Sequence, residues 1–274
     1  MADATVYSSK LHSAHVLVIG GTSGMGLGVA AASLENHAAR VTISSSSASR
    51  LTAALSHLRS LYPSRASTLF GHTCDLAAQD GLEARITSLL DAATDGRKHP
   101  IDHVVYTAGD ALHLAPFKDI SYEAIVAAGT VRFFAPLLVA KTAFYGGYLR
   151  TDASASSSPS ITLTTGSASQ RPVPGWTVTA GYAAGLHGMV RNLAVDLAPV
   201  RVNLVSPGPV DTALWDAVGA TKADVEAIKH SWTEKLLTGG IGRVEDVVEN
   251  FLAAMRNANM TGTILDSNGG ALLV

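Results

Sequence analysis

The stretch VLVIGGTSGMG, residues 16–26, joins an apolar run to a cluster of glycines. Residues 16–19 have the length and composition of a buried strand, and the alanine-rich residues 27–34 are typical of a helix. Glycine backbone can approach a pyrophosphate closely, and the N-terminus of a helix offers free N–H groups to it. The strand before the glycines and the helix after them favour a dinucleotide site over an ordinary turn.

Short runs of β-forming residues alternate with helix-length segments along the chain. The expected strands are residues 15–19, 40–44, 68–74, 101–107, 160–165, 201–205 and 262–265. The expected helices are residues 24–36, 48–61, 78–93, 121–149, 177–197 and 244–256. Strands separated by helices pair in parallel and carry helices on both faces of the sheet. We therefore expect an α/β fold, a doubly wound (Rossmann) seven-stranded parallel sheet that forms a single domain over residues 1–274.

Two segments interrupt this alternation. Residues 151–160 are rich in serine and alanine and are expected to form an exposed loop. Residues 213–240 form a long segment without a strand. In a doubly wound fold, such a segment lies beyond the carboxyl edge of the sheet, where ligands bind. We expect residues 213–240 to cover the substrate.

The composition excludes several classes of partner. The formal net charge is −2 over 274 residues, which argues against binding to nucleic acid or to an anionic membrane. The single cysteine, Cys74, cannot form an internal disulfide, and the first fifteen residues lack the apolar core of a signal peptide. We noted no apolar run near the ~18 residues that span a membrane. The ten histidines show no metal-ligand spacing. A cytoplasmic protein without a metal is expected.

Further motifs follow the glycine stretch in order along the chain. They are Cys74-Asp75-Leu76, Tyr106-Thr107-Ala108-Gly109, Arg201-Val202-Asn203 and SPGPVDT at residues 206–212. With the glycine stretch, they resemble the short-chain dehydrogenase/reductase family over nearly the whole chain. The resemblance implies an oxidoreductase that uses a nicotinamide dinucleotide.

The resemblance also implies which residues contact the cofactor. Those expected at the pyrophosphate are Gly20, Thr22, Ser23, Gly24, Met25 and Gly26. Those expected at the adenine and its ribose are Asp75, Leu76, Thr107, Ala108 and Gly109. Those expected at the nicotinamide and the phosphates are Pro207, Gly208, Val210 and Thr212. The residues alone leave a second interpretation of Asp75, as the N-cap of the helix that follows it.

The turn after the second expected strand indicates which dinucleotide is bound. Enzymes that use NAD place an acidic side chain there to bind the ribose hydroxyls. This chain instead has Ser44, Ser45 and Ser46, followed by Arg50, and no carboxylate. Hydroxyl groups, a helix N-terminus and an arginine suit a 2′-phosphate. The alternative is a solvated serine-rich turn with a surface arginine. We expect NADP(H).

The family's catalytic Asn, Ser, Tyr and Lys are not matched. In register with the family, Thr179 stands at the tyrosine position and Ala183 at the lysine position. Thr165 stands at the serine position, and Arg132 at the asparagine position. Tyr182 lies one turn beyond Thr179, with no lysine four residues further on. Because the phenol and the ammonium together form the family's proton relay, we expect that relay to be absent.

A narrower resemblance is to a fungal branch of the family. It is carried by TVRF at residues 130–133, LTTG at 163–166, PVPGW at 172–176, TAGY at 179–182 and the C-terminal segment from 261. The branch includes reductase/Diels–Alderases of prenylated indole alkaloids such as malbrancheamide and paraherquamide. The resemblance implies that NADP(H) is bound and that an iminium is reduced without the Tyr/Lys pair. These proteins carry an aspartate, implicated in proton handling, where this chain has Val173.

We therefore expect an NADP(H)-dependent reductase acting on an iminium or an activated carbonyl. An iminium carbon is already electrophilic, so positioning and exclusion of water can suffice for its reduction. The substrate is expected to be a small hydrophobic molecule, such as an indole alkaloid precursor. The alternatives are a non-redox cyclase (Diels–Alderase or isomerase) with a structural NADP, and a protein that only binds NADP(H). A homo-oligomer is expected from the resemblance.

The candidate catalytic residues are Arg132, Thr165, Trp176, Thr179 and Tyr182. Arg132 could hold an oxygen of the substrate or form a salt bridge at a helix start. Trp176 could form a wall of the pocket or belong to the core. Asp110 and His113, after the fourth expected strand, are further candidates at the same edge, and Asp110 could replace the lost acid.

Overall fold

Seven parallel strands form the centre of the computed structural model, which describes residues 7, 10–112, 116–151, 158–217 and 221–274. The strand order is β3-β2-β1-β4-β5-β6-β7. The strands are β1 (His15–Ile19), β2 (Arg40–Ser45), β3 (Leu69–Thr73), β4 (His103–Tyr106), β5 (Ser160–Thr164), β6 (Arg201–Pro207) and β7 (Ile264–Ser267). The predicted doubly wound, seven-stranded parallel sheet is confirmed.

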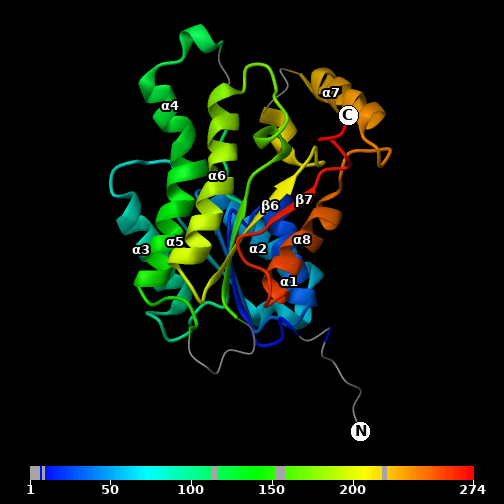
Figure 1. Cartoon of the computed structure of the whole chain (residues 1–274). Coiled ribbons are helices and arrows are strands. Elements are labelled where there is room, and N and C mark those ends of the chain that lie inside the picture. The colour runs from blue at the N-terminus through cyan, green and yellow to red at the C-terminus, as the bar shows by residue number, and fades with distance from the viewer. Residues whose placement is uncertain (1–6, 8–9, 113–115, 152–157, 218–220) are drawn as a thin grey trace.

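Helices cover both faces of this sheet (Figure 1). On one face lie α1 (Gly24–Glu35), α2 (Ala48–Leu61) and α8 (Val244–Arg256). On the other lie α3 (Leu82–Thr94), α5 (Ala135–Tyr145) and α6 (Thr177–Asp196). Short 3₁₀ turns connect the larger elements at Pro63–Thr68, Phe117–Asp119, Ser167–Ser169 and Ala213–Ala217.

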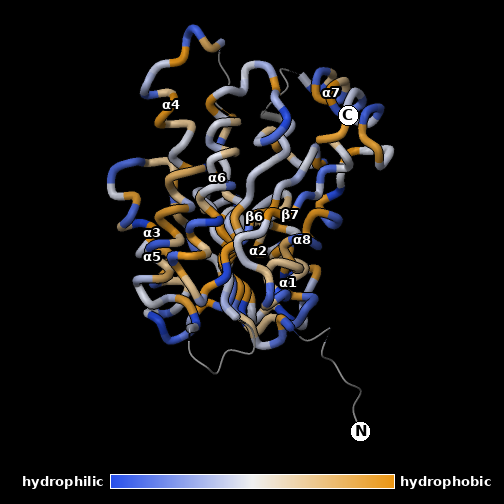
Figure 2. The backbone as a smooth tube through the Cα atoms, viewed as in Figure 1, coloured by the Kyte–Doolittle hydropathy of each residue, from blue (hydrophilic) through white to orange (hydrophobic). Residues whose placement is uncertain are grey.

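The alternation of side chains along β1 explains why the sheet is buried on both sides. Val16 and Val18 belong to the core beneath α1, α2 and α8. Leu17 and Ile19 belong to the core beneath α3, α5 and α6. Successive residues of a strand point to opposite faces, so a continuous apolar run serves two cores at once. Figure 2 shows the same result as hydrophobic colour concentrated along the central strands.

The predicted helix at residues 121–149 consists of three parts. These are α4 (Tyr122–Gly129), one π-helical turn (Thr130–Phe134) and α5, which ends at Tyr145 before two glycines. This segment, Tyr122–Tyr145, has a mean hydropathy of 1.6 over its most apolar window and is long and apolar enough to cross a membrane. This finding differs from the expectation, based on unbroken apolar runs, that no segment approaches the length of a membrane span. Its buried side chains, such as Val131 and Val139, pack into the core, as expected of a core helix.

Two other boundaries differ from the sequence-based prediction. Helix α3 begins at Leu82 rather than at residue 78, because Gly81 adopts a left-handed φ of 69° before it. Helix α7 (Lys222–Lys235) was not predicted; the Thr221 side chain caps it by accepting from the Asp224 N–H. Residues 152–157 of the expected serine-rich loop lie outside the described residues, as do residues 218–220.

Candidate active site

The glycines of the first turn bring three segments of the chain into contact. Gly20 has a φ of 90°, and a Cβ built on it would lie 2.5 Å from the Ala108 nitrogen. A Cβ at Gly26 would overlap the Gly20 carbonyl and the Thr107 hydroxyl. The Gly20 and Gly21 N–H groups donate to the Ser44 carbonyl at 3.0 and 3.1 Å. Only glycine fits at these positions, so the turn, β4 and β2 meet through their backbones.

The N-terminus of α1 is open to an anion. Ser23 is its N-cap residue, but the Ser23 side chain makes no capping hydrogen bond, and no acidic residue stands in the first turn. The first N–H groups of a helix have no partner within the helix, and the helix dipole favours negative charge there. The Thr212 methyl group lies 3.3 Å from a Cβ built on Gly24. These residues fit a dinucleotide pyrophosphate.

The end of β3 forms the expected adenine side of the site. Asp75 is exposed, Leu76 is buried, and Asp75 Oδ1 accepts from the Ala77 N–H at 2.9 Å. Since α3 begins six residues after Leu76, the interpretation of Asp75 as its N-cap is wrong. Thr107 Oγ1 donates to the carbonyl oxygens of Ile19 and Gly20, at 3.2 and 3.3 Å. Thr107 therefore fixes the glycine turn against the end of β4.

The serine-rich turn after β2 separates into buried and exposed members. Ser44 and Ser45 are buried, whereas Ser46 and Arg50 are exposed, and Arg50 Nη2 donates to Ser46 Oγ at 3.2 Å. Thr22 Oγ1 donates to Ser45 Oγ at 3.3 Å, which joins this turn to the glycine turn. A hollow of about 260 Å³ lies beside them, lined by Thr22, Leu27, Arg50, Ala53, Ala54 and His57. Hydroxyl groups and a guanidinium thus border a space suited to a phosphate.

The segment after β6 approaches the glycine turn from the other side. The Gly208 N–H donates to the Ser267 carbonyl at 2.9 Å, and a Cβ at Gly208 would lie 2.7 Å from Asn268 backbone. The Val210 carbonyl accepts from Trp215 Nε1 at 2.7 Å. Residues 207–212 are thereby held between the end of β7 and the 3₁₀ turn at Ala213–Ala217.

Thr165 and Ala183, the residues expected at the family's serine and lysine positions, contact each other. Thr165 Oγ1 donates to the Ala183 carbonyl at 2.8 Å, so this hydroxyl is bound to helix α6. Thr179 is half-buried in the first turn of α6, and Trp176 is half-buried as its N-cap residue. The Trp176 N–H donates to the Val173 carbonyl at 3.1 Å, within the proline-rich turn. The structure brings these residues to the carboxyl edge of the sheet.

Tyr182 is not brought to the same place. Its hydroxyl donates to the Ile125 carbonyl at 3.1 Å, and its ring lies 5.1 Å from Phe133 and 5.7 Å from Phe134. The ring packs so closely on Gly129 that a Cβ there would lie 2.5 Å from it. Burial raises the pKa of the Tyr182 phenol. This geometry is that of a residue that packs α6 against α4.

Arg132 forms an ion pair with Asp110. Arg132 Nε lies 3.1 Å from Asp110 Oδ1, and Nη2 donates to the Asp110 backbone carbonyl. The two side chains are 26% and 24% exposed. Burial lowers the pKa of the guanidinium, while Asp110 opposes that shift. A Cβ at Gly109 would lie 2.9 Å from Nη1, so the guanidinium also covers the expected ribose site.

Tyr106 and the π-helical turn were missed by the sequence analysis. The Tyr106 hydroxyl donates to the Val131 carbonyl at 2.5 Å, and burial raises its pKa well above the ordinary value. This bond holds the turn that carries Arg132. A single π turn inside a helix is frequent at functional sites. No sequence signal marks the one at Thr130–Phe134. His113, the other candidate at this edge, lies outside the described residues.

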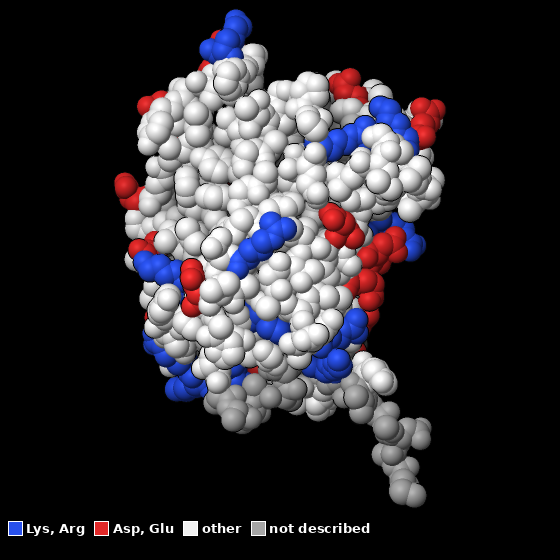
Figure 3. All heavy atoms as spheres, in the orientation of Figure 1, with Lys and Arg blue, Asp and Glu red and all other residues white. Residues whose placement is uncertain are grey.

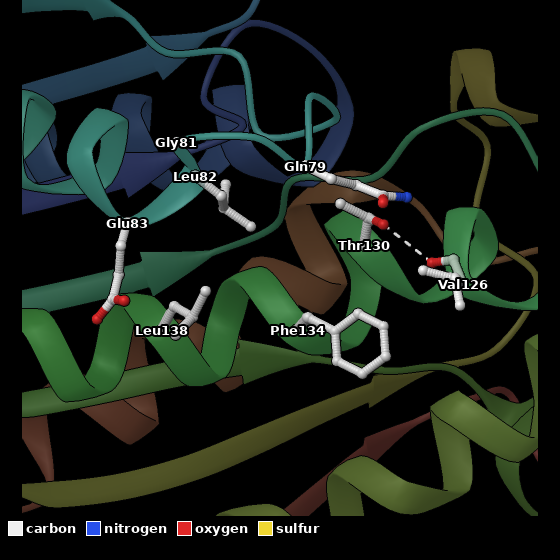
Figure 4. A pocket seen from close by; sticks show the side chains of 8 residues that line it. All are labelled: Gln79, Gly81, Leu82, Glu83, Val126, Thr130, Phe134 and Leu138. Atoms are coloured by element: carbon white, nitrogen blue, oxygen red, sulfur yellow. Dashed lines mark hydrogen bonds between the residues drawn. The ribbon is translucent and has the colours of Figure 1, made fainter. Parts of the chain in front are cut away.

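A larger hollow lies between the start of α3 and the segment Tyr122–Tyr145 (Figure 4). It measures about 460 Å³ and is lined by Gln79, Gly81, Leu82, Glu83, Val126, Thr130, Phe134 and Leu138. The glycine turn, Thr165 and Thr179 are not among its lining residues, so we assign no chemistry to it. Among the described residues, no three His, Cys, Asp or Glu side chains gather to hold a metal. On the face shown in Figure 3, most of the area between α4 and α7 carries no charged side chain.

Comparisons with known proteins support the same arrangement. A family model described as an SDR-like Rossmann domain matches residues 7–274. The short-chain dehydrogenase/reductase fsr5 of Gibberella fujikuroi is 42% identical over 274 residues, 100% of each chain. The short-chain dehydrogenase/reductase malC of Malbranchea aurantiaca is 40% identical over 266 residues, 96% of each chain.

Two solved structures are also similar. The MalC reductase/Diels-Alderase from Malbranchea aurantiaca has a TM-score of 0.87 and 38% identity, over 97% of this chain and 99% of that one. A small-chain dehydrogenase in complex with NADPH has a TM-score of 0.73 and 25% identity, over 96% of this chain and 100% of that one. Both likenesses cover nearly the whole chain.

Proposed function

The chain belongs to the short-chain dehydrogenase/reductase family, and we propose that it is an NADP(H)-dependent reductase of an iminium or activated carbonyl. One observation carries this proposal. The backbone cradle for a dinucleotide is intact, whereas the neighbouring positions of the proton relay hold Thr179 and Ala183. A member of the family that keeps the dinucleotide cradle but lacks the proton relay suits a substrate that needs no proton donor.

NADP(H) fits the residues at this edge. The N–H groups of residues 24–26 would bind the pyrophosphate, and Thr22, Ser46 and Arg50 would bind the 2′-phosphate. When bound, the cofactor supplies a hydride at its nicotinamide ring. A similar protein holds NADPH, which supports this choice.

The Arg132–Asp110 pair is suited to a cationic substrate. A lone guanidinium would repel an iminium, but the Asp110 carboxylate at 3.1 Å balances its charge. The same guanidinium can hold an oxygen of the substrate through Nη1, because Asp110 takes up Nε and Nη2. Thr165 donates to the Ala183 carbonyl and so is not free to protonate a product. In this proposal, the site orients the substrate and shields it from water, and it does not supply a proton.

The walls of the site favour a hydrophobic molecule, such as an indole alkaloid precursor of fungal secondary metabolism. Trp176 stands at the start of α6, and Trp215 follows the nicotinamide segment. Phe117 and Leu237, in segments that follow the carboxyl ends of the strands, are 74% and 64% exposed. Planar aromatic walls suit planar apolar ligands. In this proposal, residues 213–240 cover the substrate.

The proposal is tested with two substrates, one with an electrophilic iminium carbon and one with an unactivated carbonyl. The holoenzyme with NADPH should reduce an N-methyl-dihydro-β-carbolinium ion, whose charge is fixed, with one NADPH consumed per product. Acetophenone should react at least ~10²-fold more slowly, because general acid catalysis is worth ~10²–10⁴-fold. The kcat/KM for the iminium should stay flat from about pH 7 to about pH 9. Equal rates for both substrates would contradict the proposal, as would loss of all activity in both Thr179→Ala and Tyr182→Phe.

A non-redox cyclase is the second candidate, because the MalC reductase/Diels-Alderase is 38% identical in sequence and similar in structure, with a TM-score of 0.87. Val173 stands between two prolines and cannot act as an acid. If this chain cyclises, Val173→Asp should create or strengthen that activity on an azadiene precursor. Product distributions with NADPH, with NADP⁺ and without cofactor separate the two functions. Cyclised product that forms equally in all three supports the cyclase.

A homo-oligomer in the cytoplasm is also part of the proposal. On α6, Gly181 and Gly188 face open space, where a second copy could approach closely. On α5, Leu137 is 39% exposed. Sedimentation at micromolar concentration tests this, and a monomer would contradict it. Imaging of the tagged protein tests its location.

A further inference from the structure

Three segments distant in sequence meet beside the expected nicotinamide site. They are the loop 165–176 after β5, helix α7 and the C-terminal residues 268–274, whose end lies beside α7 in Figure 1. We infer that Arg171 is a positioning residue that fastens these three segments together and so sets the affinity for the substrate. The inference rests on the proposed function, in which α7 covers the substrate.

Arg171 contacts both of the other segments. Its Nη1 donates to the Ala271 carbonyl at 2.7 Å, across 100 positions of the chain. The guanidinium carbon lies 5.2 Å from the centre of the Trp232 ring in α7, within the range of a cation–π interaction. A planar guanidinium can donate in its plane and stack through its face at the same time. One side chain thus joins the loop to the tail and to α7.

The loop 165–176 is also fixed to helix α6. His187 of α6 lies 2.9 Å, through Nε2, from Ser169 Oγ. Burial lowers the pKa of the His187 imidazole. Either the ring or the Ser169 hydroxyl can donate the hydrogen of this bond. Arg171 follows Ser169 by two residues and contacts Ala271 and Trp232 instead. The loop therefore bridges a fixed helix and a peripheral one.

The tail also joins α7 to the nicotinamide segment. The Leu237 N–H donates to the Gly269 carbonyl at 2.9 Å, just after α7 ends. Gly269 and Gly270 have φ of 62° and 82°, and Cβ atoms on them would lie 2.8 Å from Thr238 and Leu237 side-chain atoms. At the other end of this stretch, the Gly208 N–H donates to the Ser267 carbonyl at 2.9 Å. The bond to Gly208 is made by the last residue of β7, whereas the bond to Leu237 is made by the tail, so loosening of residues 269–274 should be felt at α7 rather than at the nicotinamide segment.

Loss of the Arg171 contacts should change the binding of the substrate rather than that of the cofactor. Residues 24–26 and Arg50, which would bind the phosphates, belong to other segments. Trp176 lies five residues after Arg171 on the same loop, and Trp232 lies under its guanidinium. Without Arg171, the loop and α7 are free to separate at the side that should enclose the substrate. The effect should fall on KM, not on the affinity for NADPH.

Hydrogen–deuterium exchange of the NADPH-loaded enzyme tests the contact directly. Arg171→Ala should raise exchange about 10-fold in peptides covering residues 222–237 and 268–274. Arg191→Ala, an exposed arginine of α6, is the matched control and should change neither peptide. Trp232→Phe should keep protection near that of the wild type because a ring remains, whereas Trp232→Leu should lose it. Unchanged exchange in Arg171→Ala would overturn the inference, whatever the substrate.

Kinetics with the N-methyl-dihydro-β-carbolinium ion test the positioning role. Arg171→Ala should raise KM about 10-fold, with kcat within about 2-fold and the Kd for NADPH unchanged. Arg171→Lys should be intermediate, since an ammonium keeps the charge but not the planar stacking face. Raised exchange with an unchanged KM would show a purely structural contact and overturn the positioning role. If the wild type reduces no iminium, the proposed function fails, and the exchange data alone decide whether Arg171 fastens the segments.

Discussion

The glycine turn at residues 20–26 and the first two turns of α6 lie at the same edge of the sheet but carry function in different ways. The glycine turn works through backbone N–H groups and through the absence of side chains at Gly20 and Gly26. The start of α6 works in the family through specific side chains, and this chain carries others. A backbone site survives as long as the glycines remain. A side-chain site changes its chemistry with each substitution.

The hydroxyl and guanidinium groups near α6 have found partners within the protein. Thr165 donates to the Ala183 carbonyl, Tyr182 to the Ile125 carbonyl and Arg132 to Asp110. Each bond ties one element to another, so groups at or near the positions of a proton relay now stabilise the fold around the cofactor. The comparison teaches that the side chains at this edge can differ from those expected of the family while its architecture stays the same.

The largest effect should come from the backbone site. Gly20→Ala places a methyl group 2.5 Å from the Ala108 nitrogen and forces alanine to a φ of 90°. Strain and overpacking together should cost about 2–6 kcal/mol of stability or abolish NADPH binding. Thermal unfolding and NADPH fluorescence titration measure this. Gly240→Ala, where a Cβ meets open space, is the control and should be nearly neutral. A Gly20→Ala variant with unchanged thermal stability and unchanged NADPH affinity would contradict the conclusion that the glycine turn works through its missing side chains.

The next effect concerns Arg132, a cationic side chain at the chemistry end of the site. Arg132→Ala should lower kcat/KM for an oxygen-bearing substrate by a factor equivalent to roughly 2–4 kcal/mol, the value of a lost oxyanion donor. It also leaves the Asp110 carboxylate without its partner at 3.1 Å. Activity is therefore compared per folded enzyme, by circular dichroism and steady-state kinetics. An unchanged kcat/KM, with lowered stability only, would assign Arg132 to the salt-bridge role alone.

A smaller effect should appear at the 2′-phosphate. Arg50→Ala removes the exposed guanidinium that bonds Ser46 at 3.2 Å, and NADPH binding should weaken by about 1.5–3 kcal/mol. Affinity for NADH should not change, because it has no 2′-phosphate. Fluorescence titration with both reduced cofactors measures the difference. Arg59→Ala, in the last turn of the same helix, is the control. Equal wild-type affinities for the two cofactors would contradict the choice of NADP(H).

The smallest effect should come from Tyr182. Tyr182→Phe removes the 3.1 Å bond to the Ile125 carbonyl but keeps the ring contacts with Phe133 and Phe134. Stability should fall by about 1 kcal/mol, and kcat/KM should stay the same. Tyr145→Phe, at an exposed tyrosine, is the control. A large loss of activity in Tyr182→Phe alone would identify this phenol as a catalytic group and contradict its assignment to packing.

The sequence by itself determined the strands, the order of the elements, the family and the cofactor cradle. These depend on hydrophobic periodicity, which is local, and on backbone conformations that glycine adopts, which are visible residue by residue. Asp75 and the serine-rich turn could be placed because they directly follow strands of a sheet whose carboxyl edge binds ligands.

Only the tertiary structure decided which side chains reach one another. The π turn depends on the bond from Tyr106 to the Val131 carbonyl, and the Arg132–Asp110 pair joins residues 22 positions apart. Arg171 meets Ala271 across 100 positions, and Tyr182 turns toward α4 because Gly129 leaves room for its ring. No local pattern encodes such contacts, because each depends on where a distant segment packs and on which donors remain without a partner once it has packed.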